Sequence, residues 1–318
     1  MPQKGVQNKC RLYAKLINDK DENNLSHFIQ AELFAPFAAQ FKKKIYLPLM
    51  LFYDEFECNN PLGSHAGVDK LGAIYTSLMC LPPEFHSKLE NCFVTLLCNG
   101  DDRKEFGNRL TFSPLIQELK ELLKTPIYVT TKGQEVFLAF FLLTGDNLGL
   151  HEVQGFVASF VANFPCRICN MPKWLLQTSN KMYESLLRTV DSYNVDLLIN
   201  DVSKTGINEE CVFNEISTFH CILNAVVDIM HDIYEGVCRY VLCKLIIYYN
   251  KVKKYFTYKQ LNNLIGAFNF GLILNGDRPP FIKKKKVKKK FIRIYGITNL
   301  LIYKVFWFDN WTYSYNKR

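Results

Sequence analysis

The clearest pattern in the chain is a run of apolar and aromatic positions over residues 45–53. A continuous apolar run of this length predicts a strand buried on both faces. Two further segments of strand length follow at 71–80 and 92–98. Over residues 110–124 apolar side chains recur at helical spacing, which predicts a helix. The apolar run over 134–144 then predicts a fourth strand.

The order of these elements predicts an α/β fold. Ser113 and Pro114 suit the cap and first turn of the predicted helix, and a second helix is expected over 149–162. The chain therefore runs strand, strand, strand, helix, strand, helix. Asp54 follows the first strand and Asp146 follows the fourth. Ligands of three-layer α/β sheets gather outside the carboxyl ends of strands, where we expect these two acids to meet.

The rest of the chain has a different pattern. Residues before 45 are mostly polar, with one short helical candidate at 25–41, and are expected to form an arm. Helical periodicity dominates over 163–270, which predicts an inserted helical domain. After Pro280, Ala, Glu, Cys and Pro no longer occur. The predicted organisation is a polar arm (1–44), an α/β core (45–162), a helical insertion (163–280) and a Lys-rich tail (281–318).

Composition is that of a chain with a large buried core. The 318 residues are 48% hydrophobic, and the purest apolar run, 136–143, is too short to cross a bilayer. The first residues lack the apolar stretch of a secretory signal, so we expect a soluble intracellular protein with no membrane partner. Eleven scattered cysteines suit a reducing compartment, where thiols stay free or bind metal.

The net positive charge of the chain comes from the tail. The chain carries a net charge of +9, but residues 281–318 hold nine Lys and two Arg against the single acid Asp309. The body is therefore close to neutral and offers no overall attraction for phosphate backbones. The run from Lys283 to Lys290 resembles a nuclear import signal and could also bind nucleic acid without sequence preference. The alternative origin of the tail is low-complexity translation of A/T-rich sequence.

Asp54 and Asp146 are the first candidates for chemistry. Two carboxylates that meet at strand ends can hold one or two Mg²⁺ ions, which activate a water or a 3′-hydroxyl in phosphoryl transfer. The alternative is structural, because strands commonly end in solvated turns that favour acids. Spacing alone does not decide between the two.

Cys166 and Cys169 form the one Cys-x-x-Cys pair of the chain, a spacing that lets both thiolates approach a tetrahedral Zn²⁺. Such a structural site needs two more ligands, and His220, His231 and Cys211 are the candidates. His231 is favoured because it belongs to a series, Asp228, His231, Asp232 and Glu235, whose spacing predicts one face of a helix. The alternatives are unliganded thiols, a satisfied core histidine at position 220, and a solvated helix face.

Several longer strings together resemble a repetitive group of transposon-derived animal proteins that is similar to CACTA-type transposases. The resemblance covers about residues 45–280. The strings that carry it are Tyr-Asp-Glu-Phe-Glu-Cys-Asn-Asn-Pro-Leu-Gly-Ser-His-Ala-Gly (53–67), Asp-Arg-Lys-Glu-Phe-Gly (102–107), Gly-Asp-Asn-Leu-Gly (145–149), Cys-Arg-Ile-Cys (166–169) and Asp-Ile-Met-His-Asp-Ile-Tyr-Glu-Gly (228–236).

The resemblance implies a ribonuclease-H-like core, a mixed sheet flanked by helices, interrupted by a mainly helical insertion before the third acid of a triad that binds two Mg²⁺ ions. Asp54 and Asp146 match the first two acids. The cysteine pair and the Asp-x-x-His segment fall where such transposases commonly carry a structural metal site, which implies zinc. Related sequences have Asp-Asp where this chain has Asp54 and Glu55, a departure that leaves the first acid in place.

The third acid is the departure that matters. It should follow the insertion, where the Lys-rich tail begins, and neither Asp309 nor Glu235 matches its context. We therefore expect a nuclear, transposase-derived protein that is truncated and catalytically impaired, with DNA as its ancestral partner and an oligomer possible. One alternative is an active Mg²⁺-dependent nuclease or transposase in which Glu235 completes the site. The other is a non-catalytic nuclear module that binds nucleic acid.

Overall fold

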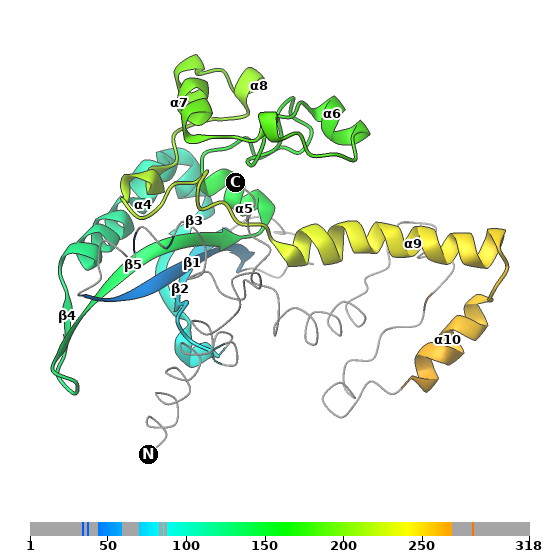
Figure 1. Cartoon of the computed structure of the whole chain (residues 1–318), viewed down its shortest axis with the longest axis horizontal. Helices are drawn as coiled ribbons and strands as arrows, with labels where there is room; N and C mark the ends of the chain where they lie inside the picture. The colour runs from blue at the N-terminus through cyan, green and yellow to red at the C-terminus, as the bar shows by residue number, and fades with distance from the viewer. Residues whose placement is uncertain are drawn as a thin grey trace. The chain divides into compact units, whose positions relative to one another are not determined.

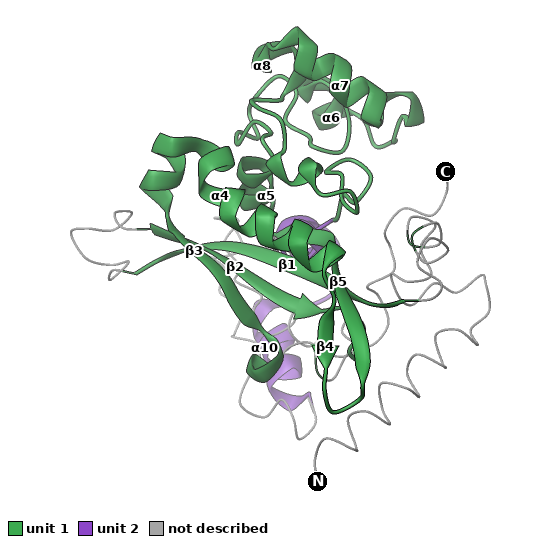
Figure 2. Ribbon diagram, turned by 90° about the vertical axis from the view of Figure 1, so that its left-hand side faces the viewer, with its two compact units in different colours: residues 1–226 green, residues 227–318 purple. Residues whose placement is uncertain are grey.

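The computed structural model describes residues 34, 37, 44–58, 70–82, 85, 88–268 and 282. The Lys-rich tail beyond Ile282 and the segment 59–67 lie outside the described residues, so the predictions made for them are not addressed. The chain divides into two units, Met1–Val226 and Val227–Arg318, which are treated separately below (Figure 2).

A five-stranded mixed sheet forms the centre of the first unit (Figure 1). The spatial order is β3-β2-β1-β5-β4, in which β1 is antiparallel to β2, β2 to β3 and β4 to β5, whereas β1 and β5 are parallel. The parallel pair is possible because a long helix intervenes between the two strands. The strands are β1 (Ile45–Glu57), β2 (Lys70–Leu78), β3 (Phe93–Asn99), β4 (Ile127–Val129) and β5 (Gln134–Gly145).

Helices α4 (Gly100–Lys124) and α5 (Asn147–Val153) cover one face of this sheet (Figure 2). Their apolar side chains, among them Phe112 and Leu150, pack in one core with Leu51, Tyr53 and Leu143 of the two parallel strands. Alternate residues of a strand point to opposite faces, so it is the odd-numbered positions of β1 that enter this core. The predicted α/β class with a mixed sheet and flanking helices is thus confirmed.

The first helix is longer than its sequence pattern predicts. It begins at Gly100 instead of residue 110, with the Asn99 side chain accepting bonds from the backbone N–H groups of Asp101 and Asp102. Its first turns are polar and bend at Gly107, which has a φ of 77°, so they show no helical periodicity. The predicted cap at Ser113 is wrong, because the helix passes through Pro114. The Ser113 hydroxyl donates to the Leu110 carbonyl, which has lost its usual donor to the proline ring.

The opposite face of the sheet carries a smaller aromatic cluster. Phe34 and Phe37, from the predicted polar arm, pack there with Tyr46 and Phe141 around the fully buried Ala139. The rings of Phe37 and Phe141 meet edge to face with centroids 4.6 Å apart. The arm therefore contributes apolar side chains to the sheet, which its overall polarity did not predict.

Beyond α5 the described part of the first unit consists of short helices and loops. The predicted helix over 149–162 stops at Val153, because Gly155 takes up a φ of 78° that turns the chain. Two buried residues, Arg188 and Tyr193, then tie the segment 163–226 together. Its helices are α6 (Lys173–Thr178), η3 (Glu184–Leu186), α7 (Val190–Ile199), α8 (Val202–Thr205) and η4 (Val212–Glu215).

In the second unit a long helix is made of three consecutive segments, η5 (Met230–Cys238), α9 (Arg239–Ile247) and η6 (Tyr248–Val252), of which the first and last are π-helical. It packs on α10 (Tyr258–Ala267), which is capped by Thr257 and Gln260. No described helix is long and apolar enough to cross a membrane. The domain boundaries predicted at 44, 162 and 280 stay predictions.

Candidate functional site

The carboxyl ends of β1 and β5 place the two predicted acids on neighbouring strands. Tyr53 pairs with Gly145 in the parallel register, so Asp54, within β1, and Asp146, just after β5, are the residues that follow this pair. β1 continues beyond this point to Glu57 along β2, whereas β5 ends and the chain enters α5. The expectation that both acids come to one end of the sheet therefore agrees with the backbone.

Asp146 has a structural task at this position. It is the N-cap of α5, and its Oδ1 accepts the backbone N–H of Gly149 at 2.6 Å. A Cβ on Gly149 would lie 2.9 Å from that oxygen, closer than real Cβ atoms approach, and 3.0 Å from the Tyr53 ring, which is a tight contact. The Gly-Asp-Asn-Leu-Gly string thus has a packing explanation: the last glycine makes room for the capping carboxylate beside Tyr53.

Asp54 and Asp146 do not share one face of the sheet. Tyr53 is 1% exposed and belongs to the core under α4 and α5, where the Asp146 carboxylate also lies. Asp54 is exposed and alternates with Tyr53, so its side chain leaves the strand on the opposite face. Its assignment as a catalytic residue stays a prediction that the backbone register supports and the side-chain direction does not.

Glu55, which the sequence patterns did not single out, points to the same side as Tyr53. Its Oε2 lies 3.4 Å from Lys70 Nζ and its Oε1 lies 3.7 Å from Nη2 of Arg103 in α4. The same Nη2 forms an ion pair with Glu152 of α5. One guanidinium nitrogen therefore bridges two carboxylates from two elements that meet at the carboxyl ends of β1 and β5.

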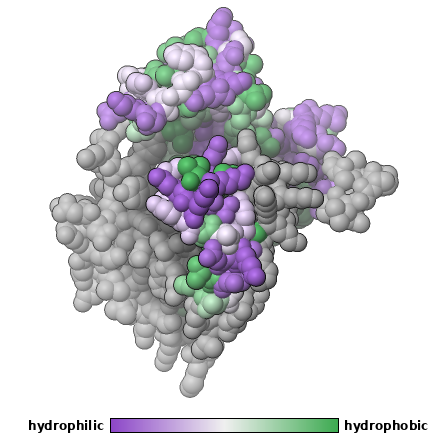
Figure 3. All heavy atoms as spheres, turned by 90° about the vertical axis from the view of Figure 1, so that its right-hand side faces the viewer, coloured by the Kyte–Doolittle hydropathy of each residue, from purple (hydrophilic) through white to green (hydrophobic). Residues whose placement is uncertain are grey.

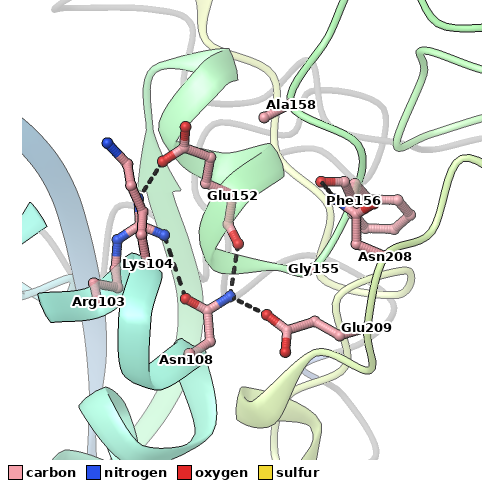
Figure 4. Close-up of a pocket in the computed structure, with 10 residues that line it drawn as sticks. Arg103, Lys104, Asn108, Glu152, Gly155, Phe156, Ala158, Asn208 and Glu209 are labelled. Carbon is pink, nitrogen blue, oxygen red and sulfur yellow. Dashed lines mark hydrogen bonds and ion pairs between the residues drawn. The ribbon is translucent and has the colours of Figure 1, made fainter. Parts of the chain in front are cut away.

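Asn108 extends this cluster toward a cavity of about 250 Å³ (Figure 4). Its Oδ1 accepts a bond from Arg103 Nη1 at 3.4 Å, and its Nδ2 donates to the Glu152 carbonyl and to Glu209 Oε1, both at 2.7 Å. Arg103 and Asn108 are 5% and 4% exposed. We call Glu55, Arg103, Asn108, Glu152 and Glu209 the Arg103 cluster.

The charges of the Arg103 cluster reinforce one another. Burial alone would lower the pKa of Arg103, but the carboxylates of Glu152 and Glu55 raise it, as would an ionised Tyr53, so the overall shift is upward. Burial also raises the pKa of the Tyr53 hydroxyl, so this group stays neutral. Arg103 is therefore a permanent cation. It lies between Glu55 and Glu152, where a divalent ion that bridged the two carboxylates would have to bind. Only the Asp-Arg-Lys-Glu-Phe-Gly string hinted at Arg103 in the sequence, because its partners lie far away along the chain.

Cys166 and Cys169 lie in one loop of the first unit. The backbone N–H of Ile168 donates to Cys166 Sγ at 3.3 Å, and an antiparallel bridge joins Cys169 to Leu187. A hydrogen bond from the Cys169 thiol, together with backbone N–H groups, lowers the pKa of Cys166 to about 6. The same bond raises the pKa of Cys169. One thiolate is thus stabilised, as metal binding requires.

The histidines predicted to complete a zinc site are described, but the described residues bring no group of three metal-ligating side chains together. His220 is half-buried, its Nδ1 accepts the Ile222 N–H at 3.2 Å, and its ring packs on Tyr193. Cys211 is buried, and its thiol is hydrogen-bonded to that of Cys221. The ligand assignments of His220 and Cys211 stay predictions.

His231 belongs to the second unit, where its Nδ1 is paired with the Asp228 carboxylate. Asp228 does not lie on the helix face that its spacing predicted. It precedes η5 and accepts the backbone N–H groups of Met230 at 2.9 Å and His231 at 3.2 Å, as an N-cap does. Glu235 lies within η5, but its side chain is outside the description, so its role as a third acid is unaddressed.

No protein-family model and no curated protein matches the chain. The arguments for its function are therefore those of the residues and of their arrangement.

Proposed function

We propose that the chain is a transposase-derived protein with a ribonuclease-H-like core, whose ancestral Mg²⁺-dependent cleavage and transfer of DNA strands is impaired. The observation that carries the proposal is the parallel register of β1 and β5, which brings the backbone positions of Asp54 and Asp146 to the same end of the sheet. The sheet order β3-β2-β1-β5-β4, in which β1 and β5 are parallel and α4 lies between β3 and β4 along the chain, is compatible with such a core and supports the proposal.

The described residues fit a two-metal centre poorly, and this supports impairment. Asp54 leaves β1 on the face opposite to Asp146, and Asp146 is occupied in capping α5. The carboxylates on the Asp146 face, Glu55 and Glu152, are bridged by Arg103. Two-metal catalysis needs carboxylates that converge on the ions and clamp both the attacking and the leaving oxygen. We therefore derive no catalytic step through a metal at this site.

A cleavage assay tests the proposal. The full-length protein is incubated with supercoiled plasmid and with labelled oligonucleotides in Mg²⁺ or Mn²⁺, beside the variant Asp146→Ala. We expect neither nicking nor joining above background, and no difference between the two proteins. The matched control is Asp201→Ala, which removes another capping aspartate, that of α8, far from β1 and β5 along the chain. Cleavage that Asp146→Ala abolishes and Asp201→Ala retains would establish an active nuclease instead.

We further propose that Cys166 and Cys169 hold a structural Zn²⁺. The support is the loop geometry, in which a backbone N–H donates to the sulfur of Cys166 and the pKa of that thiol is lowered. Two thiolates would contribute half of a tetrahedral set, with His220 and His231 as predicted partners. The zinc would fasten the loop to the residues that complete the set, a purely architectural role.

Metal analysis of protein purified without chelators tests the zinc proposal. We expect about one equivalent of Zn²⁺ per chain and its loss in Cys166→Ser. Cys221→Ser, which alters a buried thiol that belongs to a different pair, is the matched control and should keep the metal. Reduced, folded protein without zinc would contradict the proposal.

A further inference from the structure

Positive charge gathers in one part of the second unit, although residues 1–280 together are close to neutral. The segment 239–268 carries six bases and no acid. Lys251, Lys253 and Lys254 are close together, at the end of the long helix and in the turn that follows η6. All three are exposed, and the ion pairs of the described residues involve none of them. Their charges are therefore available to an anionic partner.

Three tyrosines lie beside these lysines. Tyr248, Tyr249 and Tyr255 are 42%, 38% and 71% exposed. The rings of Tyr249 and Tyr255 stack with their centroids 5.7 Å apart, and Tyr248 meets Tyr249 edge to face. The Nζ of Lys253 lies 5.8 Å from the centroid of the Tyr248 ring. We call the three lysines and the three tyrosines the Tyr-Lys turn.

The backbone of the Tyr-Lys turn is held by its own hydrogen bonds. The N–H of Tyr255 donates to the Tyr249 carbonyl at 2.9 Å, and Asn250 Nδ2 donates to the Phe256 carbonyl at 2.7 Å. Phe256 packs against the buried cluster between the long helix and α10. Lys254 has a φ of 55°, a conformation that a lysine rarely adopts unless its surroundings impose it. A turn fixed in this way loses little conformational freedom when a ligand binds.

The side chains of the turn suit a ligand that carries both phosphates and aromatic rings. Ammonium groups attract phosphates, and exposed aromatic side chains stack on nucleic-acid bases. Tyr255 stacks on Tyr249 with one face of its ring, so the other face is open to a base. Bases in a duplex already stack on one another, whereas those of a single strand offer their faces. Figure 3, which views the side on which α10 lies in Figure 1, shows strongly hydrophilic surface residues directly beside hydrophobic ones.

We propose that the Tyr-Lys turn binds single-stranded nucleic acid. A base stacks on the open face of Tyr255, and the three lysines contact the neighbouring phosphates. DNA and RNA share this chemistry, because the contacts use bases and phosphates and not the sugar. An anionic membrane would satisfy the lysines but would leave the stacked tyrosine rings without an aromatic partner. The turn belongs to the second unit, whereas Asp54 and Asp146 belong to the first, so this binding does not depend on the proposed ancestry in DNA cleavage.

Tyrosine variants test the stacking. Fluorescence anisotropy of the full-length protein is measured with labelled single strands of deoxythymidine or of uridine, and with a duplex of mixed sequence. Tyr255→Ala should weaken binding of the single strands by about fivefold or more, the loss of one stacked base, and should leave duplex binding unchanged. Tyr255→Phe keeps the ring and should bind as the wild type does. Wild-type affinity in Tyr255→Ala, or an equal loss for the duplex, would overturn the proposal.

Lysine variants test the phosphate contacts. Lys253→Gln with Lys254→Gln should weaken binding by about tenfold and flatten its salt dependence, since each lost phosphate contact lowers the slope of log affinity against log salt by about 0.7. The matched control is Lys124→Gln with Lys181→Gln, which removes two exposed lysines of the first unit. Equal losses in the two double variants would show that only net charge matters and would contradict the proposal.

Cross-linking locates the contact on the chain. With strands that contain thiouridine, mass spectrometry should find cross-links at Tyr248, Tyr249 or Tyr255. Cross-links confined to the Lys-rich run 283–290 would assign binding to the tail and overturn the proposal. Vesicles of phosphatidylserine are the last probe: if the lysine variant loses vesicle binding and keeps oligonucleotide binding, the turn is a membrane contact and the proposal fails. The cleavage assay depends on Asp146 and these assays do not, so the two proposals can fail separately.

Discussion

Two buried arginines of the first unit hold the chain together in different ways. Arg188 uses every nitrogen of its guanidinium: Nε bonds to the Cys166 carbonyl at 3.3 Å, Nη1 to Asp196 at 2.8 Å and Nη2 to the Thr205 carbonyl at 2.6 Å. Arg103 binds Glu152, Glu55 and Asn108 through Nη1 and Nη2, but its buried Nε has no hydrogen-bond partner. Arg103 also lines the cavity of about 250 Å³.

The two arginines differ in how their buried charge is compensated. Burial lowers the pKa of Arg188, and the protein compensates with a complete set of acceptors. The pKa of Arg103 is raised overall, because two carboxylates are placed beside it. Two acids and a cation lie together beside a cavity. We interpret the Arg103 cluster as the remains of a cation-binding centre, and Arg188 as a scaffold.

The largest effect that distinguishes the two arginines is on stability. Arg188→Met removes three hydrogen bonds and leaves the part-buried Asp196 without its ion-pair partner, so the free energy of unfolding should fall by about 3–5 kcal/mol. Urea denaturation followed by fluorescence measures it. Arg109→Met is the control, since Arg109 pairs with Glu215 at the surface and should change stability by about 0–1 kcal/mol. Equal losses for both variants would contradict the scaffold role.

Replacement of Arg103 should lower stability less than replacement of Arg188 does. It should also allow a divalent ion to bind. Arg103→Met should lower the free energy of unfolding by about 2 kcal/mol, because the carboxylates it leaves are still 18% and 24% exposed to water. Freed of the guanidinium, Glu55 and Glu152 should then bind divalent ions. The melting temperature of Arg103→Met should rise with Mn²⁺, whereas that of the wild type should not.

The double variant Arg103→Met with Glu152→Gln is the control for this ion response. It lacks one of the two carboxylates and should not respond to Mn²⁺. An equal response in the single and the double variant would show that the ion binds elsewhere, and the interpretation of the Arg103 cluster as a former cation site would fail.

The sequence predicted the strands far better than this cluster. β1, β2, β3 and β5 were predicted within four residues at each end, because buried strands leave continuous apolar runs. β4 has three residues and was missed, as was the polar first part of α4. Arg103, Asn108 and Glu152 meet only through tertiary packing, and no local pattern marks them. Asp146 was found because a strand end is local, but its role as a helix cap needed the structure.

Because Asp146 caps α5, its replacement should have a moderate effect on the free energy of unfolding. Asp146→Ala should lower the free energy of unfolding by about 1 kcal/mol, because the Gly149 N–H at the start of α5 loses its acceptor. Asp146→Asn keeps an oxygen acceptor and should recover most of this loss. Thermal and urea unfolding of the three proteins measure it. If the alanine and asparagine variants lose equal stability, the negative charge of Asp146 matters beyond capping, and a bound cation becomes the better explanation.

The smallest effect concerns His151, whose ring nitrogens lie 2.5 Å from the Asn147 carbonyl and 3.0 Å from the Pro165 carbonyl. Burial lowers its pKa, and the charges of Arg167 and Arg188 lower it further, although the hydrogen bonds to both carbonyls oppose this. In the unfolded chain a histidine titrates near ~6.5.

Above that pH the ring is neutral in both states and its contribution to stability is complete. As the pH falls below it, the unfolded chain binds a proton that the folded chain resists, so stability decreases by at most about 1.4 kcal/mol per pH unit. His151→Gln should flatten this dependence between pH 7 and 5 in urea denaturation. Arg103→Met should leave the slope unchanged, because Arg103 is not among the charges that act on His151. If the dependence of stability on pH changes in Arg103→Met and not in His151→Gln, the pH-sensitive group belongs to the Arg103 cluster. The roles assigned to Arg103 and Arg188 would then be wrong.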